Sequence, residues 1–481
     1  MLEHIKKILS HTTLYGFASL SNIVSGLVLL PFYLKYLSIE EFAYFSLIMN
    51  FGTLIVYIVD LGLITSIVRL YYDMSDDINE VKKLFSTGLI AYSVLSLLVI
   101  TFVFFSRFKL NSFITNSRTD PLLILLMTGI ACLNLIFCVP QNMLRVRFEP
   151  SKYFLLSILK SVLTVLILFS FIMIFKNKLI FIFMTFLNVS LLVTFLGLFI
   201  NYRYFSISFS AKLLKTILLI GLPFWPTLIF TWLIDSSNIF FIKHFVSLES
   251  SAVYSFGHKI GQIVYYIVTS FAIAWIPISF RIKENEATPQ LTLSRIFNWY
   301  VLVLSSISLF LCMISYRFIY FFAKSEYYAA TSIIPIIAFG YIMYGVYYYF
   351  LTGILYSKKL YLQTYTLMAA AVLNILLNLF LVPKFTLIGS SIALVMSYLT
   401  AALVALYFSQ KQFYIPYQFN RLAKSVGSVL LTYGIFIKID NLIPNIYLHL
   451  FFGIIIYFVF ISILKLIDIR SLYNSVVNAY G

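Results

Sequence analysis

The sequence has few charged residues. Aspartate, glutamate, lysine and arginine make up 11% of its 481 residues, whereas soluble proteins contain about 25%. Hydrophobic residues make up 62%, and the mean hydropathy is +0.98. This composition excludes a soluble globular domain. The apolar runs are continuous and do not alternate with polar residues, which excludes a transmembrane β-barrel. The sequence therefore predicts an all-α, polytopic membrane protein.

Patterns that carry chemistry are scarce as well. The three cysteines, Cys132, Cys138 and Cys312, lie in apolar segments, and they offer neither a disulfide framework nor the spacing of a metal site. The sequence has no phosphate-binding glycine loop of the P-loop type and no arrangement of a nucleophile with a base. We therefore expect no enzymatic activity, no cofactor, no metal and no ATP hydrolysis by this chain.

Basic residues outnumber acidic residues by 34 to 17. In a membrane protein this excess lies in the loops, where it sets topology and contacts anionic lipid, so we expect membrane lipids and not nucleic acid as partners. With the N-terminus inside, the predicted cytoplasmic loops and termini hold 21 lysines and arginines, and the opposite loops hold 11. This bias predicts that both termini are cytoplasmic. Every predicted loop is short, which argues against a glycan polymerase with a large external catalytic loop.

The lengths of the apolar runs predict about 14 spans, because a helix needs about 20 apolar residues to cross a bilayer. The predicted spans are roughly 12–36, 42–69, 84–106, 121–144, 153–175, 179–201, 214–242, 251–280, 296–317, 331–356, 360–382, 386–409, 422–439 and 444–466.

An internal repeat organises these spans. The stretch Phe32–Ser46 reads FYLKYLSIEEFAYFS, and Phe240–Ser255 reads FFIKHFVSLESSAVYS. Matching residues recur downstream at an offset of 208 or 209. A repeat of six spans keeps its orientation, so its two copies are related by an axis along the membrane normal. We predict two parallel six-helix lobes plus two extra helices, with the boundaries 1–208 for spans 1–6, 209–413 for spans 7–12, and 414–481 for spans 13–14 and a cytoplasmic tail.

Three charges interrupt the predicted spans at depth: Asp60, Asp235 and Lys259. A charge inside a spanning helix costs roughly 2.5–3.5 kcal/mol on insertion scales, so such residues face a bundle interior or a wet cavity and often mark a transport route. Asp235 lies 12 residues before Ser247 and Lys259 lies 12 residues after it. Their matching depth on a predicted hairpin allows an ion pair, which is either structural or part of a cleft.

Other residues have two interpretations. Lys160, in predicted span 5, either reaches the membrane interface or faces a cavity. Arg69 stands at an inner helix end, where arginines commonly set topology. The tyrosines of predicted span 10, Tyr341 to Tyr349, serve either packing and the interfacial belt or the stacking of sugars. Pro223 and Pro226 interrupt predicted span 7, where proline kinks a helix and can form a hinge for alternating access.

Four stretches then carry a resemblance. They are LLPFYLKYLSIEEFAYFSLIMN (29–50), VPQNMLRVRFEPSKYFLLSILKSVL (139–163), GLPFWPTLIFTWLIDSSNIFFIKHF (221–245) and NILLNLFLVPKFTLIGSSIALVMSYL (374–399). In their order and spacing the chain resembles the bacterial polysaccharide flippases. These are the O-antigen and capsule repeat-unit transporters of the multidrug/oligosaccharidyl-lipid/polysaccharide exporter superfamily.

The resemblance implies a fold of two six-helix lobes around a cleft, with two further helices. It implies a lipid-linked oligosaccharide, typically on undecaprenyl diphosphate, that is flipped from the inner to the outer leaflet of the bacterial cytoplasmic membrane for O-antigen, capsule or exopolysaccharide assembly. It also implies alternating access without ATP, driven by a coupling cation, either a proton or sodium. Polysaccharide polymerase and chain-length proteins are further expected partners.

With that cargo in view, we expect the cations of the cleft to meet the diphosphate. These are Lys259, His258, Lys160 and Arg69. Asp60 and Asp235 would gate them or bind the coupling cation, and Pro223 and Pro226 would form the hinge. The matching stretches lack a dense run of intramembrane arginines, so a full set of charged sites does not carry over. The alternatives are a multidrug exporter, whose cleft needs acidic residues, a peptidoglycan-precursor exporter, and a membrane glycan polymerase.

Overall fold

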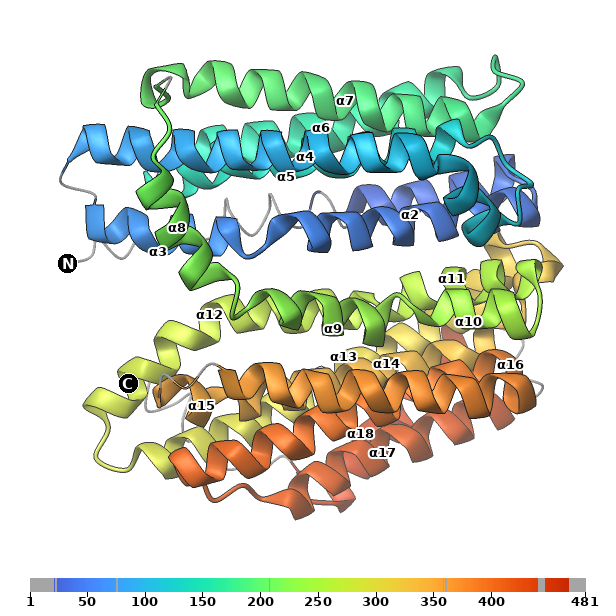
Figure 1. The fold of residues 1–481 in the computed structure, drawn as a ribbon. Coiled ribbons are helices and arrows are strands. Elements are labelled where there is room, and N and C mark those ends of the chain that lie inside the picture. Colours follow the sequence, from blue (N-terminus) through green and yellow to red (C-terminus); the bar gives the residue numbers. More distant parts are fainter. Residues whose placement is uncertain are drawn as a thin grey trace. The chain divides into compact units, whose positions relative to one another are not determined.

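The computed structural model describes residues 21, 24–74, 77–206, 208–357, 359, 361–439 and 446–466. Every regular element within these residues is a helix (Figure 1), which confirms the predicted all-α fold. The chain divides into two compact units, residues 1–255 and 256–481. The predicted boundaries at 208 and 413 stay a prediction.

The first unit is a bundle centred on α5. Its elements in order are a helix over Val24–Tyr36, α2 (Ile39–Asp60), α3 (Leu63–Met74), α4 (Ile78–Thr115), α5 (Leu122–Val146), α6 (Pro150–Phe171), α7 (Lys178–Ile200), the 3-10 turn η1 (Tyr202–Tyr204), α8 (Ala211–Gly221), α9 (Trp225–Asp235), α10 (Asn238–Phe245) and the first part of α11 (Leu248–Gly261). The central helix α5 packs against α2, α4 and α7. Its Phe137 shares an apolar core with Leu156 of α6 and Val193 of α7.

The two copies of the sequence repeat begin corresponding helices in the same way. Ser38 caps α2: its Oγ accepts from the Glu41 amide at 3.1 Å, and Glu41 Oε2 accepts from the Ser38 amide at 2.8 Å. Its repeat mate Ser247 precedes α11, where its Oγ accepts from the Ser250 amide at 3.0 Å. A side chain that accepts from the third residue of a helix satisfies an amide that has no intrahelical partner. The repeated serine is therefore a repeated helix start.

Helix α4 is much longer than its neighbours. Its 38 residues extend about 57 Å at 1.5 Å per residue. The turn after its last residue is closed by Asn111, whose Oδ1 accepts from the hydroxyls of Thr115 and Thr119 at 2.8 Å each. The side-chain Nδ2 of Asn111 donates to the Thr119 carbonyl at 2.6 Å. This compact network holds the connection to α5.

The second unit continues from the end of α11. Its elements are α12 (Ile263–Asn285), α13 (Pro289–Phe322), the 3-10 turn η2 (Ser325–Tyr327), α14 (Ala330–Phe350), α15 (Thr352–Tyr356), α16 (Tyr361–Gln412), α17 (Phe419–Lys438) and α18 (Ile446–Ile463). Helix α14 packs against α12, α13 and α16. Helix α16 is kinked at Thr386, the first residue of the predicted span 386–409, which follows the predicted span 360–382. A buried bond spans the kink, from Ser390 Oγ to Asn378 Oδ1 at 2.8 Å.

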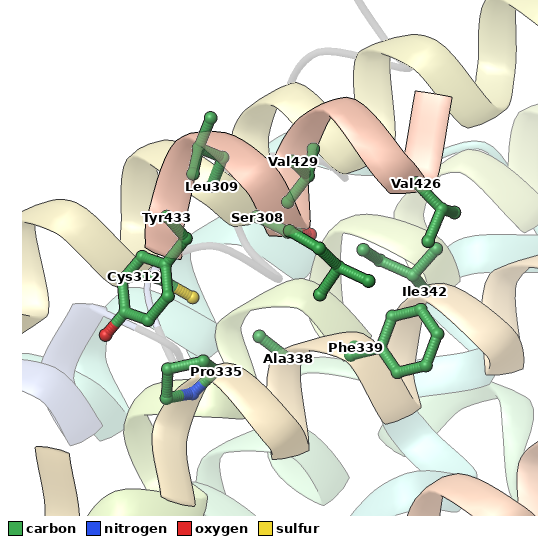
Figure 2. Close-up of a pocket in the computed structure, with 11 residues that line it drawn as sticks. Ser308, Leu309, Cys312, Pro335, Ala338, Phe339, Ile342, Val426, Val429 and Tyr433 are labelled. Carbon is green, nitrogen blue, oxygen red and sulfur yellow. The ribbon is translucent and has the colours of Figure 1, made fainter. Parts of the chain in front are cut away.

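Helices α17 and α18 pack on α13 around a buried apolar cluster that includes Leu309, Met313 and Phe436. A cavity of about 30 Å³ lies between α13, α14 and α17. Cys312, Phe339 and Tyr433 are among the residues that line it (Figure 2). Its volume is enough for water but not for a sugar. This cavity is therefore a packing gap of the second unit.

A buried histidine, His449 of α18, joins α18 to α13 and α17. Nε2 of His449 lies 2.8 Å from the Phe436 carbonyl oxygen, which only accepts, and Nδ1 lies 3.0 Å from Arg317 Nη2, which only donates. These partners require a neutral ring that is protonated at Nε2. The ring also stacks on Phe436 at 3.9 Å between ring centroids. His449 thus links α18 to α13 and α17.

In the part of the chain that the structure describes, nine helices are long and apolar enough to cross a membrane, or ten if α8 to α10 form one bent span. The apolar helices Val24–Tyr36 and Leu448–Ile463 are shorter. The predicted number of 14 is therefore not confirmed. The start of predicted span 12–36, the start of 444–466 and both chain termini lie outside the described residues.

The predicted orientation gives a direct experiment. Reporter fusions after residues 148 and 288 should read as cytoplasmic, and fusions after 113, 247 and 325 should read as external, because lysine and arginine are retained on the cytoplasmic side. Alkaline phosphatase and green fluorescent protein fusions measure the two outcomes in the same cells. An inverted pattern at two or more sites would contradict the orientation.

Candidate functional site

Two broken helices meet in the first unit. Helices α2 and α3 are separated by Leu61 and Gly62, both with positive φ, at 47° and 73°. Helix α8 ends at Gly221, and the chain resumes as α9 with a bend of 47°. The two breaks touch through their glycines: a Cβ on Gly62 would lie 2.6 Å from the Gly221 carbonyl oxygen, and a Cβ on Gly221 would lie 2.7 Å from that of Leu61. The two backbones can approach this closely only because both positions are glycine and carry no Cβ.

Asp60 lies at this junction, as the last residue of α2. It is buried, with 9% of its surface exposed, and its carboxylate accepts a short hydrogen bond from the hydroxyl of Tyr92 on α4. The Tyr92 oxygen accepts in turn from the Ile64 amide at 3.0 Å, in the first turn of α3. The amides of Gly62 and Ile64 also face the carboxylate. The arrangement fits an ionised carboxylate at the positive end of a helix dipole.

The predicted break of span 7 at the two prolines is confirmed, although the prolines differ in position. Pro223 lies in the break between α8 and α9, and Pro226 lies in the first turn of α9. A proline in a first turn removes no intrahelical hydrogen bond, so Pro226 is compatible with the start of α9. The indole of Trp225 donates to the Tyr57 carbonyl of α2 at 2.8 Å. The hinge role of the prolines stays a prediction.

Lys160 lies inside the first unit, between α5, α6 and α7. Its ammonium donates to Asn134 Oδ1 at 2.6 Å, and the same oxygen accepts from Ser190 Oγ at 3.3 Å. Phe137 lies 5.5 Å from the ammonium. One turn along α5, Cys138 is within electrostatic range of both Lys160 and Asp60. Lys160 and Asp60 form no ion pair with each other.

His258 and Lys259 lie on the part of α11 that belongs to the second unit. Gly257 and Gly261 pack closely against Ile333 and Ile337 of α14, and His258 Nε2 lies 2.9 Å from the hydroxyl of Tyr341, also on α14. At about 100° per residue, Lys259 points about 200° away from Gly257. It therefore lies on the face of α11 opposite α14. Within the described part of this unit, its ammonium has no hydrogen-bond or ion-pair partner.

The tyrosines of α14 form the interior of the second unit. Tyr341 and Tyr347 are almost fully buried, at 0% and 1% exposure, and Tyr344 is 8% exposed. The Tyr344 ring lies 5.1 Å from Tyr265 of α12 and 5.0 Å from Tyr398 of α16. These contacts correspond to the packing interpretation of the tyrosine-rich segment.

The remaining predicted residues are dispersed. Arg69 is exposed on α3, and Asp235 is half-buried at the end of α9. Asp235 belongs to the first unit and Lys259 to the second, so their ion pair stays a prediction. Sequence reasoning missed Tyr92, Gly62 and Gly221. Tyr92 gives no signal in the sequence, because it lies 32 residues from Asp60, whereas a glycine directly after the Asp60–Leu61 pair is a weak sign of a helix end.

The sequence of the first unit and the start of the second matches a known protein family. The sequence profile of the polysaccharide biosynthesis protein family matches residues 8–283, which is more than half of the chain. The chain belongs to this family. The match confirms the resemblance to polysaccharide exporters that the sequence showed. A search of curated protein sequences found no match to the chain.

Solved structures show the fold of this family member. A structure of the lipid II flippase MurJ in an inward closed conformation aligns with a TM-score of 0.75 and 16% identity, over 97% of this chain and all of MurJ. An inward-facing multidrug resistance MATE transporter aligns with a TM-score of 0.66 and 15% identity, over 82% of this chain and 94% of its own. A Vibrio cholerae MATE transporter gives 0.57 and 13% over 84% and 96%. The chain is a multi-pass membrane protein with the fold that MurJ and MATE transporters share.

Proposed function

We propose that the protein flips a lipid-linked oligosaccharide from the inner to the outer leaflet of the bacterial cytoplasmic membrane. Three observations support this. The chain belongs to a polysaccharide biosynthesis family, and it has the fold of a lipid II flippase. The observation that carries the proposal is Lys259, an intramembrane cation on the face of α11 that α14 leaves uncovered.

The chemistry of the cargo suits such a cation. A diphosphate headgroup is anionic and cannot cross about 30 Å of hydrocarbon without compensation. Lys259 has no anionic partner within the described part of its own unit, and Lys160 is held by the neutral amide of Asn134. A cation whose charge is not neutralised by a carboxylate remains available to an anionic group. The polyprenyl tail can stay in the bilayer while the headgroup crosses.

We assign the other predicted residues to the same cycle. His258 and Arg69 would extend the cationic path, Asp60 and Asp235 would gate it or bind the coupling cation, and the break at Pro223 would bend during alternating access. The lobes would be residues 1–208 and 209–413, with 414–481 as an accessory pair of helices. Undecaprenyl diphosphate is the expected carrier, and a polymerase and chain-length proteins are the expected partners in O-antigen or capsule assembly. No ATP hydrolysis is expected.

A multidrug exporter is the second candidate, because the MATE alignment covers 82% of this chain. Such a protein would bind cationic drugs, which a cleft that contains Lys259 disfavours by charge repulsion. The two candidates therefore differ in the sign of the charge they accept.

A reconstituted assay tests the proposal. Purified protein in liposomes that contain a fluorescent undecaprenyl diphosphate oligosaccharide should move the lipid between leaflets, measured by its accessibility to an added glycosidase. Protein-free liposomes and liposomes with an unrelated helical membrane protein are the controls. Leaflet exchange at the rate of the controls, together with proton-driven export of a cationic dye, would reject the flippase in favour of the multidrug exporter.

A further inference from the structure

The junction of the two broken helices connects a titratable group to a bend. Asp60 ends α2, and the hydroxyl of Tyr92 joins its carboxylate to the first turn of α3. The carboxylate and the phenol therefore hold the turn at Leu61 and Gly62, in which both residues have positive φ. Leu61 is not a glycine, so this turn persists because the surrounding contacts hold it.

The same turn touches the end of α8. Gly62 and Gly221 meet backbone to backbone, with no side chain between them that could absorb a displacement. The start of α9 is attached to α2 as well, through the indole of Trp225 and the Tyr57 carbonyl. Both sides of the 47° bend are thus connected to the segment that Asp60 holds.

We propose that Asp60 is a proton-operated control of the bend between α8 and α9, with Tyr92 as its positioning residue and the contact of Gly62 with Gly221 as the connection. The proposal rests on the proposed transport function only in one respect: the purpose of the bend would be to couple transport to a proton gradient. It names the proton as the ion that Asp60 binds.

The step involves one proton and no redox change. The ionised carboxylate accepts from the Tyr92 hydroxyl and faces the amides of Gly62 and Ile64. When a proton from water binds a carboxylate oxygen, the negative charge disappears and these charge-assisted bonds weaken. The Leu61–Gly62 turn loses its support, and Gly221 follows it. Tyr92 keeps its own proton throughout.

Few titratable groups surround Asp60. Tyr92 faces it from α4, and Cys138 of α5 lies within electrostatic range. Arg145 on α5 and Lys160 on α6 also act electrostatically on Cys138. Arg69 on α3 and Lys215 on α8 are exposed. The carboxylate is the acidic group at this junction among the described residues.

Pulsed electron paramagnetic resonance can measure the bend. Spin labels at Lys215 of α8 and His244 of α10, both exposed, report the distance across it in a variant whose three cysteines are replaced by alanine. The protein is studied in liposomes without cargo, so the outcome does not depend on the flippase assay. We expect the distance distribution to shift reversibly between pH 8 and pH 5. Asp60→Asn should show the low-pH distribution at every pH.

Four further variants separate the roles. Tyr92→Phe removes a donor to the ionised form, so the shift should occur at higher pH. Gly221→Ala places a Cβ against Leu61 and should abolish the response to pH, whereas Gly434→Ala, where a Cβ has open space, should leave it intact. If Gly221→Ala does not insert, Trp225→Phe replaces it and should broaden the distribution. A pH-independent distance in the unmutated pair, or an unchanged response in Asp60→Asn, would overturn the proposal even if the protein flips its cargo.

Discussion

Replacing Lys259 with glutamine should abolish glycan export while leaving the protein in the membrane. The ammonium lies on α11 opposite the face packed on α14, so its loss leaves that packing intact. If it meets the diphosphate, the cleft loses the cation that offsets the cargo's charge. If it pairs with Asp235, the change takes that cation away from the carboxylate; loss of one partner costs about 3–5 kcal/mol in buried soluble pairs and less where water enters. Surface glycan and membrane protein level, measured in the same cells, give the result.

The double variant distinguishes the two roles. If the pair is only structural, Asp235→Asn with Lys259→Gln should regain both membrane insertion and export. If Lys259 binds the cargo, the double variant should insert and still fail to export. Lys212→Gln, which removes an exposed cation at the start of α8, is the matched control and should export normally. Full export by the single Lys259→Gln variant at normal protein level would contradict both roles.

Replacing His449 with alanine should strongly destabilise the second unit. The change removes a fully buried ring stacked on Phe436, and it leaves the Arg317 guanidinium and the Phe436 carbonyl without their hydrogen bonds to that ring. Lost packing and lost hydrogen bonds together should cost about 3 kcal/mol. Thermal unfolding in detergent measures the effect.

Two other histidine variants sharpen that test. His449→Gln can donate to the carbonyl and accept from arginine through one amide, so it should retain much of the lost stability. His244→Ala, at an exposed position of α10, should change little. Equal unfolding temperatures for His449→Ala and His244→Ala would show that the link between the three helices contributes no stability.

Local signals predicted much of the helical fold. Continuous apolar runs identified helices, Pro223 marked the break between α8 and α9, and the gap between two predicted spans fell next to the kink at Thr386. The predicted count of spans was less secure, because run length does not show whether an apolar segment is one span, a bent pair or a shorter helix. The predicted span 42–69 is interrupted at Leu61 and Gly62, where a single glycine within an apolar run is a weak signal.

The candidate site could be predicted only in part from the sequence. A charged residue inside an apolar run is recognisable there, whereas the residues that bind it are not. Asp60 and Lys160 stand out from their surroundings in the sequence. Their partners Tyr92 and Asn134 lie 32 and 26 residues away on other helices, and both are common residue types. Which partner meets which charge depends on helix rotation and tilt, and these follow from packing over the whole bundle.

The length of α4 affects how the first unit meets the bilayer. Helices α2, α6 and α7 have 22 or 23 residues, about 33–35 Å, which matches a hydrocarbon core of about 30 Å. Helix α4 exceeds that thickness by more than 20 Å. Its C-terminal turns carry the exposed Phe105, Phe108 and Phe113, and Arg107 folds back over Phe104 and Phe108. Rings and a guanidinium of this kind favour the headgroup layer. A thicker membrane would cover more of α4 and a thinner membrane would cover less of it. The shorter helices around α4 would then have to adapt to any hydrophobic mismatch.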